Sequence, residues 1–230
     1  KVLTHGLDAE TPRIVGKGDD PRSPLLPETG EVSLYDVMTA LARLLGLPIP
    51  EALPAASGGA VRTPYFCAGC PHSTSTRIPD GHLAIGGIGC HTLAMFMDRG
   101  MRTFSHMGGE GATWIGIAPF TGTRHVFQNM GDGTYQHSGS LGIRAALAAG
   151  VNVTFKILYN DAVAMTGGQA VEGTPSVARI ARELLAEGIA SLAVVSDQPD
   201  RLDRGAFPKG CSFHHRDELD AVQRRLADTP

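Results

Sequence analysis

The chain has 230 residues and a formal net charge of −3 at pH 7, and its apolar fraction of 42% is ordinary for a globular protein. It contains no run of Lys or Arg, which argues against nucleic-acid binding and against a basic membrane-binding surface. No apolar stretch is long enough to cross a bilayer and no signal peptide opens the chain, so we expect a cytoplasmic protein.

Residues 1–62 differ in composition from the rest, and we expect them to form a linker or arm with one helix. Pro, Gly and Asp dominate as far as Gly30, and Ser33 then offers an N-cap. Apolar residues follow at helical spacing: Val37, Met38, Leu41, Leu44 and Leu45. Because Lys1 stands where a start methionine would be, we interpret the chain as a fragment of a longer polypeptide.

From residue 63 to residue 230 the sequence alternates between strand and helix patterns. The expected strands are residues 82–89, 123–133, 151–161 and 189–197, and the expected helices are residues 91–98, 137–150, 176–188 and 216–228. Ser176 and Gly188 are the predicted start and stop signals of one helix. This alternation predicts an α/β domain of three layers, α/β/α, around a mostly parallel sheet.

Two of the expected strands end in polar residues that suit a metal ion. Asp132 lies between Gly131 and Gly133 at the end of one strand, and Asn160 ends the next. Parallel strands end at the same edge of a sheet, where such folds bind ligands. Carboxylate and amide oxygens suit Mg²⁺, and the glycines allow a diphosphate to approach the backbone. A lone Gly-Asp-Gly is more simply a tight turn, but its pairing with Asn160 favours a site.

This pattern resembles the signature of thiamine-diphosphate proteins. Thr166-Gly-Gly-Gln169, Cys67-x-x-Cys70 and Cys90 narrow the resemblance to the 2-oxoacid:ferredoxin oxidoreductases. The segments GCPH, MGGEGATWIG and VFQNMGDGTYQHSG resemble the indolepyruvate branch, in particular its long fused bacterial members. The resemblance extends from about residue 63 to residue 226 and implies the thiamine-diphosphate-binding fold of the diphosphate-binding type.

The resemblance also implies cofactors, ligands and partners. Mg²⁺ would be held by Asp132, Asn160 and the carbonyl of Ala162. The implied cofactor-binding residues are Gly87, Gly89, Gly131, Asp132, Gly133, Asn160, Ala162, Thr166 and Gly167. The implied reaction is oxidative decarboxylation of an arylpyruvate, with acyl transfer to coenzyme A and electron transfer through a [4Fe–4S] cluster to ferredoxin. Further partners would be other domains of the same polypeptide, in a homo-oligomer.

Four cysteines are present, and the spacing of Cys67 and Cys70 favours metal or redox chemistry over a disulfide. The resemblance implies that Cys67, Cys70 and Cys90 are iron–sulfur ligands, and such a cluster needs four thiolates. Cys211 is the only cysteine left, but in the family the fourth ligand lies further along the chain, and a free or buried thiol is its simpler interpretation. A zinc site that includes His72 or His91 is the alternative.

No residue is identified with certainty as catalytic. His137 and Glu110 are candidates by position, as His106 is more weakly; a surface histidine and a loop carboxylate in water are the plainer interpretations. The resemblance places the glutamate that activates the cofactor on another domain, so we expect the isolated chain not to oxidise 2-oxoacids. Two other functions stay open: a cluster-free thiamine-diphosphate decarboxylase or synthase, and a non-catalytic metal-binding module.

Overall fold

The structure is a computed structural model that describes residues 24–27, 29–52, 62–170, 173 and 175–229. The chain divides into two units, Lys1–Val61 and Arg62–Pro230, and each is described by itself. Residues 1–23 of the expected arm and residues 53–61 of its linker lie outside the described residues. Among the helices that are described, none combines the length and apolar character needed to cross a membrane.

The described part of the first unit contains one helix, α1 (Leu34–Leu45). Ser33 is its N-cap, as predicted, because its hydroxyl accepts the N–H of Asp36 at 3.1 Å and Asp36 accepts the N–H of Ser33 at 2.8 Å. This reciprocal pair satisfies two amide groups that the first turn leaves free. Gly46 ends the helix in the left-handed conformation, with φ 66°.

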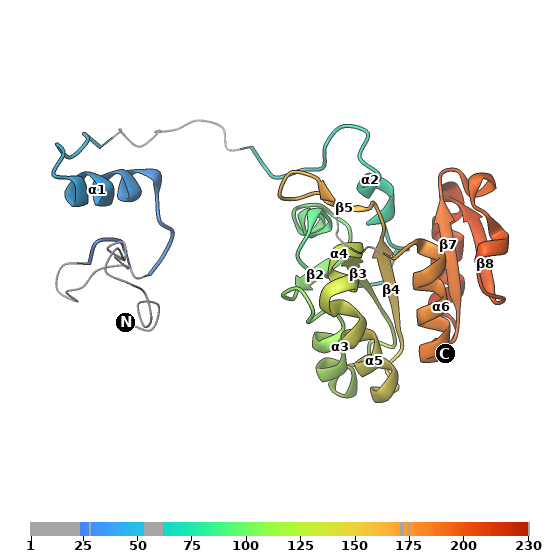
Figure 1. The fold of residues 1–230 in the computed structure, drawn as a ribbon. Coiled ribbons are helices and arrows are strands. Elements are labelled where there is room, and N and C mark those ends of the chain that lie inside the picture. Colours follow the sequence, from blue (N-terminus) through green and yellow to red (C-terminus); the bar gives the residue numbers. More distant parts are fainter. Residues whose placement is uncertain (1–23, 28, 53–61, 171–172, 174, 230) are drawn as a thin grey trace, which may run out of the picture. The chain divides into compact units, whose positions relative to one another are not determined.

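The second unit is built around a four-stranded sheet in the order β2-β1-β3-β4, and every strand pairs in parallel (Figure 1). The strands are β1 (Ala84–Gly86), β2 (Met101–Phe104), β3 (Val126–Gly131) and β4 (Val153–Leu158). β3 and β4 pair without a register shift, from Val126 opposite Val153 to Gly131 opposite Leu158. Their carboxyl ends therefore lie side by side, and the predicted parallel sheet is confirmed.

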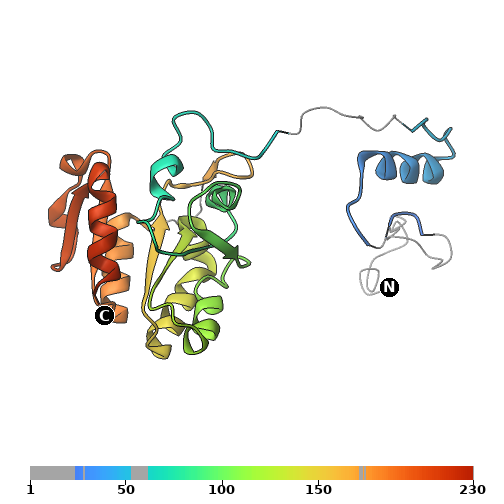
Figure 2. The same cartoon turned by 180° about the vertical axis from the view of Figure 1, so that it is seen from behind.

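Helices cover both faces of this sheet. Met130 of β3 packs with Ile143 of α5 (Ser140–Ala149) and Ile180 of α6 (Val177–Glu187). Trp114 of α3 (Ala112–Ile117) belongs to the same side, where it contacts residues of β1 and β3. On the opposite face, Phe127 packs with residues of the 3-10 helix η2 (Cys90–Phe96) and of α7 (Leu219–Ala227). Figure 2 shows this opposite face, with α7 in red. The three layers are those that the sequence predicts.

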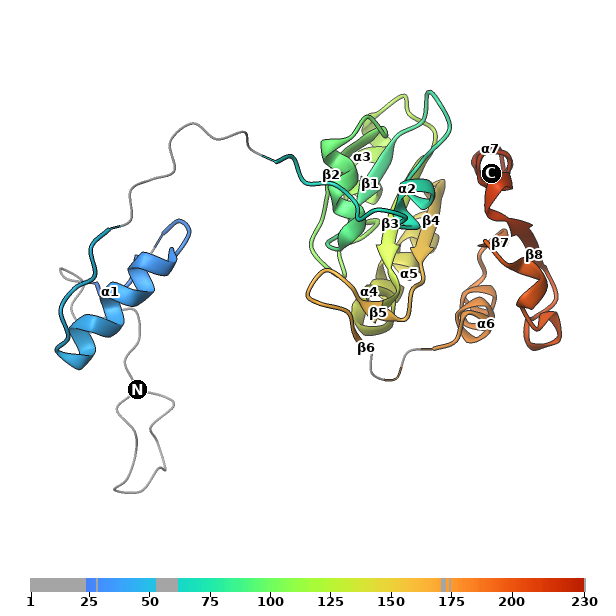
Figure 3. The same cartoon turned by 90° about the horizontal axis from the view of Figure 1, so that it is seen from above.

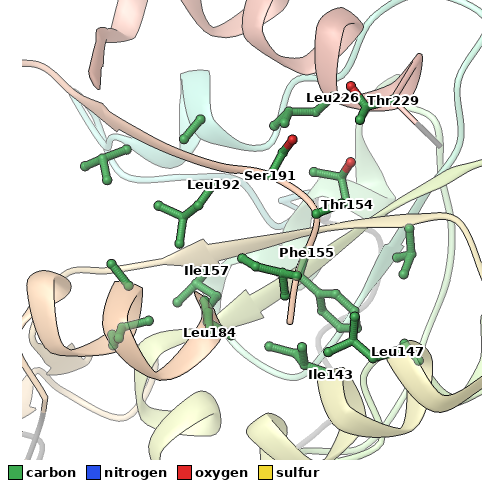
Figure 4. A pocket seen from close by; sticks show the side chains of 18 of the residues that line it. Ile143, Leu147, Thr154, Phe155, Ile157, Leu184, Ser191, Leu192, Leu226 and Thr229 are labelled. Carbon is green, nitrogen blue, oxygen red and sulfur yellow. The ribbon is translucent and has the colours of Figure 1, made fainter. Parts of the chain in front are cut away.

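The strands β7 (Leu192–Ser196) and β8 (Cys211–His215) form a separate parallel pair (Figure 3). The sequence predicts one sheet, whereas β7 pairs with β8 and not with β4. A cavity of about 830 Å³ lies between β4, α5, α6 and β7. Its lining is mostly apolar, and Figure 4 shows it. None of the predicted site residues lines this cavity.

Several elements differ from the expected ones. The helix after β3 begins at Asp132 and not at His137: α4 (Asp132–Thr134) continues through a π-helical turn, η4 (Tyr135–Gly139), into α5. Ser176 and Gly188 do bound α6, as predicted. The structure adds α2 (His72–Ser75), the hairpin strands β5 (Ala162–Val163) and β6 (Gln169–Ala170), and the short helices η3 (Ala118–Phe120), η5 (Pro199–Arg201), η6 (Arg204–Ala206) and η7 (Arg216–Glu218).

Candidate functional site

The carboxyl edge of the sheet brings together the two polar strand ends that the sequence singles out. Asp132 follows β3 and is buried, and Asn160 follows β4. The Asp132 carboxylate accepts the N–H of Asn160 at 3.0 Å and the N–H of Asp161 at 2.7 Å through Oδ2. Figure 1 shows α2, α4 and β5 at this same end of the sheet. The expected meeting of Asp132 with Asn160 is therefore observed.

The oxygens at this edge fit one Mg²⁺ ion. A carboxylate offers about four lone-pair positions, and Asp132 uses three, because its Oδ1 also accepts the N–H of Gly133 at 2.8 Å. Asn160 Oδ1 accepts the N–H of Ala162 at 3.2 Å, which leaves a further lone pair on that oxygen. Asp161 between them has φ 55°, a left-handed conformation that is uncommon outside glycine. The loop therefore bends around Asp132, and the side chains of Asp132 and Asn160 each keep a free acceptor position.

The predicted cofactor loop, Gly87–Gly89, is held by two residues that sequence reasoning missed. The N–H of Gly87 donates to His91 Nε2 at 3.2 Å. The Thr92 hydroxyl donates to the carbonyl of Gly87 and accepts the N–H of Gly89 at 3.1 Å. Burial, with the charge of His72, lowers the pKa of His91 to about 4, so its ring is neutral at pH 7 and can accept this bond. The sequence feature that could have indicated these two roles is Cys-His-Thr, directly after the glycines.

Thr166 and Gly167 lie in the turn of the β5–β6 hairpin. The Thr166 hydroxyl donates to Gln169 Oε1 at 2.8 Å, and Gln169 Nε2 donates to the Thr166 carbonyl at 2.9 Å. Gly167 and Gly168 have φ values of 122° and 79°, which side chains other than glycine rarely adopt. The hairpin begins at Ala162, so the turn belongs to the same short segment as Asn160 and Ala162.

Three of the four free cysteines lie near one another. Cys67 and Cys70 share a turn in which the N–H of Cys70 donates to the carbonyl of Cys67 at 3.0 Å. Burial raises the pKa of Cys90, and the charges of Cys70 and Cys67 raise it further. Cys211 begins β8, and only burial raises its pKa.

The zinc alternative is not supported by the arrangement of these side chains. Zn–S bonds of about 2.3 Å require ligand sulfurs within about 4 Å of each other. Across the part of the chain that the structure describes, no three His, Cys, Asp or Glu side chains gather in a group that could hold a metal ion.

His72 links the cysteine segment to the proposed metal site. It is the first residue of α2, and burial lowers its pKa while the charge of Asp132 raises it. The ring of His72 also lies 6.4 Å from that of His91, measured between centroids. The contact between the two rings brings the cysteine segment next to the glycine loop.

The two candidate catalytic residues have opposite exposures. His137 lies in the π-helical turn and is exposed, whereas Glu110 is completely buried in the loop between β2 and α3. The alternative interpretation of Glu110 as a loop carboxylate in water is therefore wrong. His106 lies in the same loop, near enough for its charge to lower the pKa of Glu110.

Gln128 positions the loop that contains Glu110. The sequence does not indicate this role, because a polar residue inside a strand has no obvious function. It is fully buried, and its Oε1 accepts the N–H of Gly111 at 3.0 Å. Its Nε2 donates to the carbonyl of Asn129 at 3.0 Å. Trp114 of α3 is a core residue, 3% exposed.

Comparison with known proteins gives three kinds of match. Residues 87–194 match the family described as "Thiamine pyrophosphate enzyme, C-terminal TPP binding domain". The indolepyruvate oxidoreductase subunit IorA of Methanothermobacter marburgensis is 32% identical over 76% of this chain and 29% of the relative. The subunit of the same name from Archaeoglobus fulgidus is 29% identical over 65% of this chain and 26% of the relative.

A solved structure of 2-oxoglutarate:ferredoxin oxidoreductase from Magnetococcus marinus is also similar, with a TM-score of 0.47 and 21% identity over 68% of this chain and 64% of that chain. The chain spans less than a third of the length of the curated relatives that it matches. The sequence matches confirm the resemblance to the indolepyruvate oxidoreductases.

Proposed function

We propose that this chain, a relative of the indolepyruvate oxidoreductases with a thiamine-diphosphate-binding domain, binds thiamine diphosphate and Mg²⁺ in an enzyme that oxidatively decarboxylates 2-oxoacids. The proposed substrates are arylpyruvates of the indolepyruvate type, and the proposed product is an acyl-CoA. The observation that supports this best is the meeting of Asp132 with the segment from Asn160 to Ala162 at the carboxyl edge of the sheet.

Each part of the site has a proposed task. Asp132, Asn160 and the carbonyl of Ala162 would hold Mg²⁺. The diphosphate would lie against the start of the helix that begins at Asp132, because the first turn of a helix presents N–H groups that favour an anion. At Gly131 an added Cβ would meet only Thr134 Oγ1, at 3.9 Å, so this backbone is open to a ligand. When bound, thiamine diphosphate supplies the carbanion chemistry, and these residues orient it.

We propose Cys67, Cys70 and Cys90 as ligands of an iron–sulfur cluster that passes electrons to ferredoxin. The charges of Cys70 and Cys67 raise the pKa of Cys90, and the charge of Asp132 raises that of His72, two positions after Cys70; both effects support this assignment. This set of three cysteines also favours the oxidoreductase over a cluster-free decarboxylase or synthase. Coenzyme A, ferredoxin and other domains of the polypeptide are the proposed partners, in a homo-oligomer in the cytoplasm.

Titration with thiamine diphosphate, followed by calorimetry in Mg²⁺ and again in EDTA, tests the proposal. We expect binding that depends on Mg²⁺ and that Asp132→Ala and Asn160→Ala each weaken at least about tenfold, the equivalent of about 1.4 kcal/mol. Asp161→Asn removes a neighbouring charge without removing a proposed ligand, and should bind as the wild type does. If the wild type does not bind, or if neither variant changes the affinity, the proposed site is wrong.

A further inference from the structure

The cavity between β4 and β7 is bounded by two strand edges. On one side every residue of Ser191–Ser196 lines it, and on the other so does every residue of Val151–Phe155, which leads into β4. Side chains of a strand point alternately to two faces, so an unbroken run of lining residues means that the edge of the strand borders the cavity. Among the described residues, β4 is the last strand of its sheet and β7 pairs only with β8.

The backbone at these two edges is free to pair. Neither Val153–Leu158 nor Leu192–Ser196 takes part in the backbone hydrogen bonds that the described residues form in turns, loops and caps. The N–H and C=O groups that each strand turns away from its own sheet therefore face the cavity. A ligand that covers these groups must also pair them, because an unpaired buried donor or acceptor costs about 1–3 kcal/mol.

Helices close the two faces of the cavity. On one face α6 is fixed to the four-stranded sheet, because Ile180 belongs to the core beneath it. On the other face α7 is fixed to β4, because Gln223 Oε1 accepts a hydrogen bond from Lys156 Nζ at 2.6 Å. Figure 4 shows Leu226 of α7 on one side of the cavity and Leu184 of α6 on the other. The cavity is therefore a slot with two polar edges and two apolar walls.

The dimensions of the slot suit one strand. A strand residue in a packed layer takes about 3.3 Å along the strand, about 4.8 Å between strands and about 10 Å between layers, or about 160 Å³. The volume of about 830 Å³ therefore holds about five residues, which is the length of β7. A strand with helices on both faces is apolar throughout. A compact apolar molecule would fill the same volume but leave both rows of backbone groups unpaired, so the edges favour a peptide.

The strand that fits this slot comes from outside the described part of the chain. Each of the strands from β1 to β8 already pairs with a neighbour. The curated relatives are more than three times as long as the region that this chain matches, so they contain much further polypeptide. Other domains of the polypeptide are already among the proposed partners, and they are the source that these lengths favour.

We propose that the slot between β4 and β7 binds an extended, apolar segment of about five residues from another domain of the polypeptide. This segment pairs with both edges and joins the four-stranded sheet and the β7–β8 pair into one sheet. Its backbone supplies the hydrogen bonds and its alternate side chains contact α6 and α7, as in other cases of strand addition. The inference rests on the proposed function in its choice of partner.

Hydrogen exchange measured by mass spectrometry tests this proposal. In this chain alone, alternate amides of Val153–Leu158 and Leu192–Ser196 should exchange quickly, because they face the slot. In the polypeptide that includes the partner domains, the same amides should exchange at least about tenfold more slowly. Val126–Gly131 of β3 is the internal control, because it has a strand on each side and should be protected in both forms. Equal exchange of β4 and β7 in the two forms would overturn the proposal.

A variant that fills the slot separates strand binding from other causes of protection. Ala181 of α6 is 2% exposed and lines the slot, so the ring of Ala181→Phe should occupy the place of the strand. The polypeptide with this change should lose the added protection, whereas Ala145→Phe, on the exposed side of α5, should keep it. If Ala181→Phe does not fold, Leu184→Trp carries the test. Full protection in the variant that fills the slot would overturn the proposal.

The remaining outcomes identify other occupants, and each would overturn the proposal. Protection that appears as this chain alone is concentrated would indicate a second copy. A small molecule retained by the purified chain in native mass spectrometry would indicate an apolar ligand. Protection in the dilute chain alone would show that β7 closes directly on β4. Thiamine diphosphate binding should be the same in Ala181→Phe and the wild type, since no predicted cofactor residue lines the slot. Failure of the wild type to bind it would contradict the proposed function, and the exchange results would still decide the occupant of the slot.

Discussion

Replacement of Asp132 by Asn should destabilise the second unit even when no ligand is present. The carboxylate accepts three backbone N–H groups, one through Oδ1 from Gly133 and two through Oδ2 from Asn160 and Asp161. An amide of the same shape offers one oxygen, so its best orientation keeps the pair at Oδ2 and turns an NH₂ group toward Gly133. One lost hydrogen bond to a charged group costs about 1.5–3 kcal/mol, and the remaining two become weaker.

We therefore expect Asp132→Asn to lower the free energy of unfolding by about 2–3 kcal/mol. For a domain of this size that corresponds to a fall in Tm of roughly 4–12 °C. Thermal unfolding followed by circular dichroism, in EDTA, measures it. Asp161→Asn is the matched control, because the same charge is lost from an exposed neighbour whose left-handed conformation Asn tolerates. An unchanged Tm in Asp132→Asn, or an equal fall in the control, would refute the assigned hydrogen bonds.

Two other predictions concern the cysteines and a partly buried lysine, Lys156. Iron and acid-labile sulfide, measured after anaerobic reconstitution, should fall sharply in Cys67→Ser and stay unchanged in Cys211→Ser; equal losses in both variants would contradict the ligand assignment. Lys156 donates to the Arg77 carbonyl at 2.9 Å and to Gln223 Oε1 at 2.6 Å, and burial, with the charge of Arg99, lowers its pKa to about 7. The unfolded state therefore binds more protons between pH 7 and pH 10, and the wild type should gain stability relative to Lys156→Met over that range. If the difference in unfolding free energy between the wild type and Lys156→Met does not vary with pH, the folded structure does not lower the pKa of Lys156.

Features that depend on local sequence were the most predictable. Ser33 and Ser176 cap their helices as expected, because a side-chain oxygen that can accept the free amides of a first turn has the same effect in any fold. The meeting of Asp132 and Asn160 was also predictable, since it needs only the rule that neighbouring parallel strands end at one edge.

Features that depend on tertiary contacts were not predictable in this way. The sequence of β7 does not state that its partner is β8 and not β4, because strand pairing depends on contacts between segments that are far apart in the chain. The roles of His91 and Thr92 exist only once the loop that they hold has folded back onto them. Glu110 contradicts the general expectation that carboxylates stay in water, and only the glycines packed against it explain how it fits.

Asp132, a proposed metal ligand, also supports the structure of this edge of the sheet. Asp132 supports the loop after β4 through backbone hydrogen bonds, and its charge also acts on His72 at the start of the cysteine segment. His72 in turn helps to keep His91 neutral, and a neutral His91 accepts the N–H of Gly87 in the cofactor loop. More than 60 positions separate Cys67 from Asp132 along the chain, yet the charge of Asp132 acts on His72, two positions after Cys70.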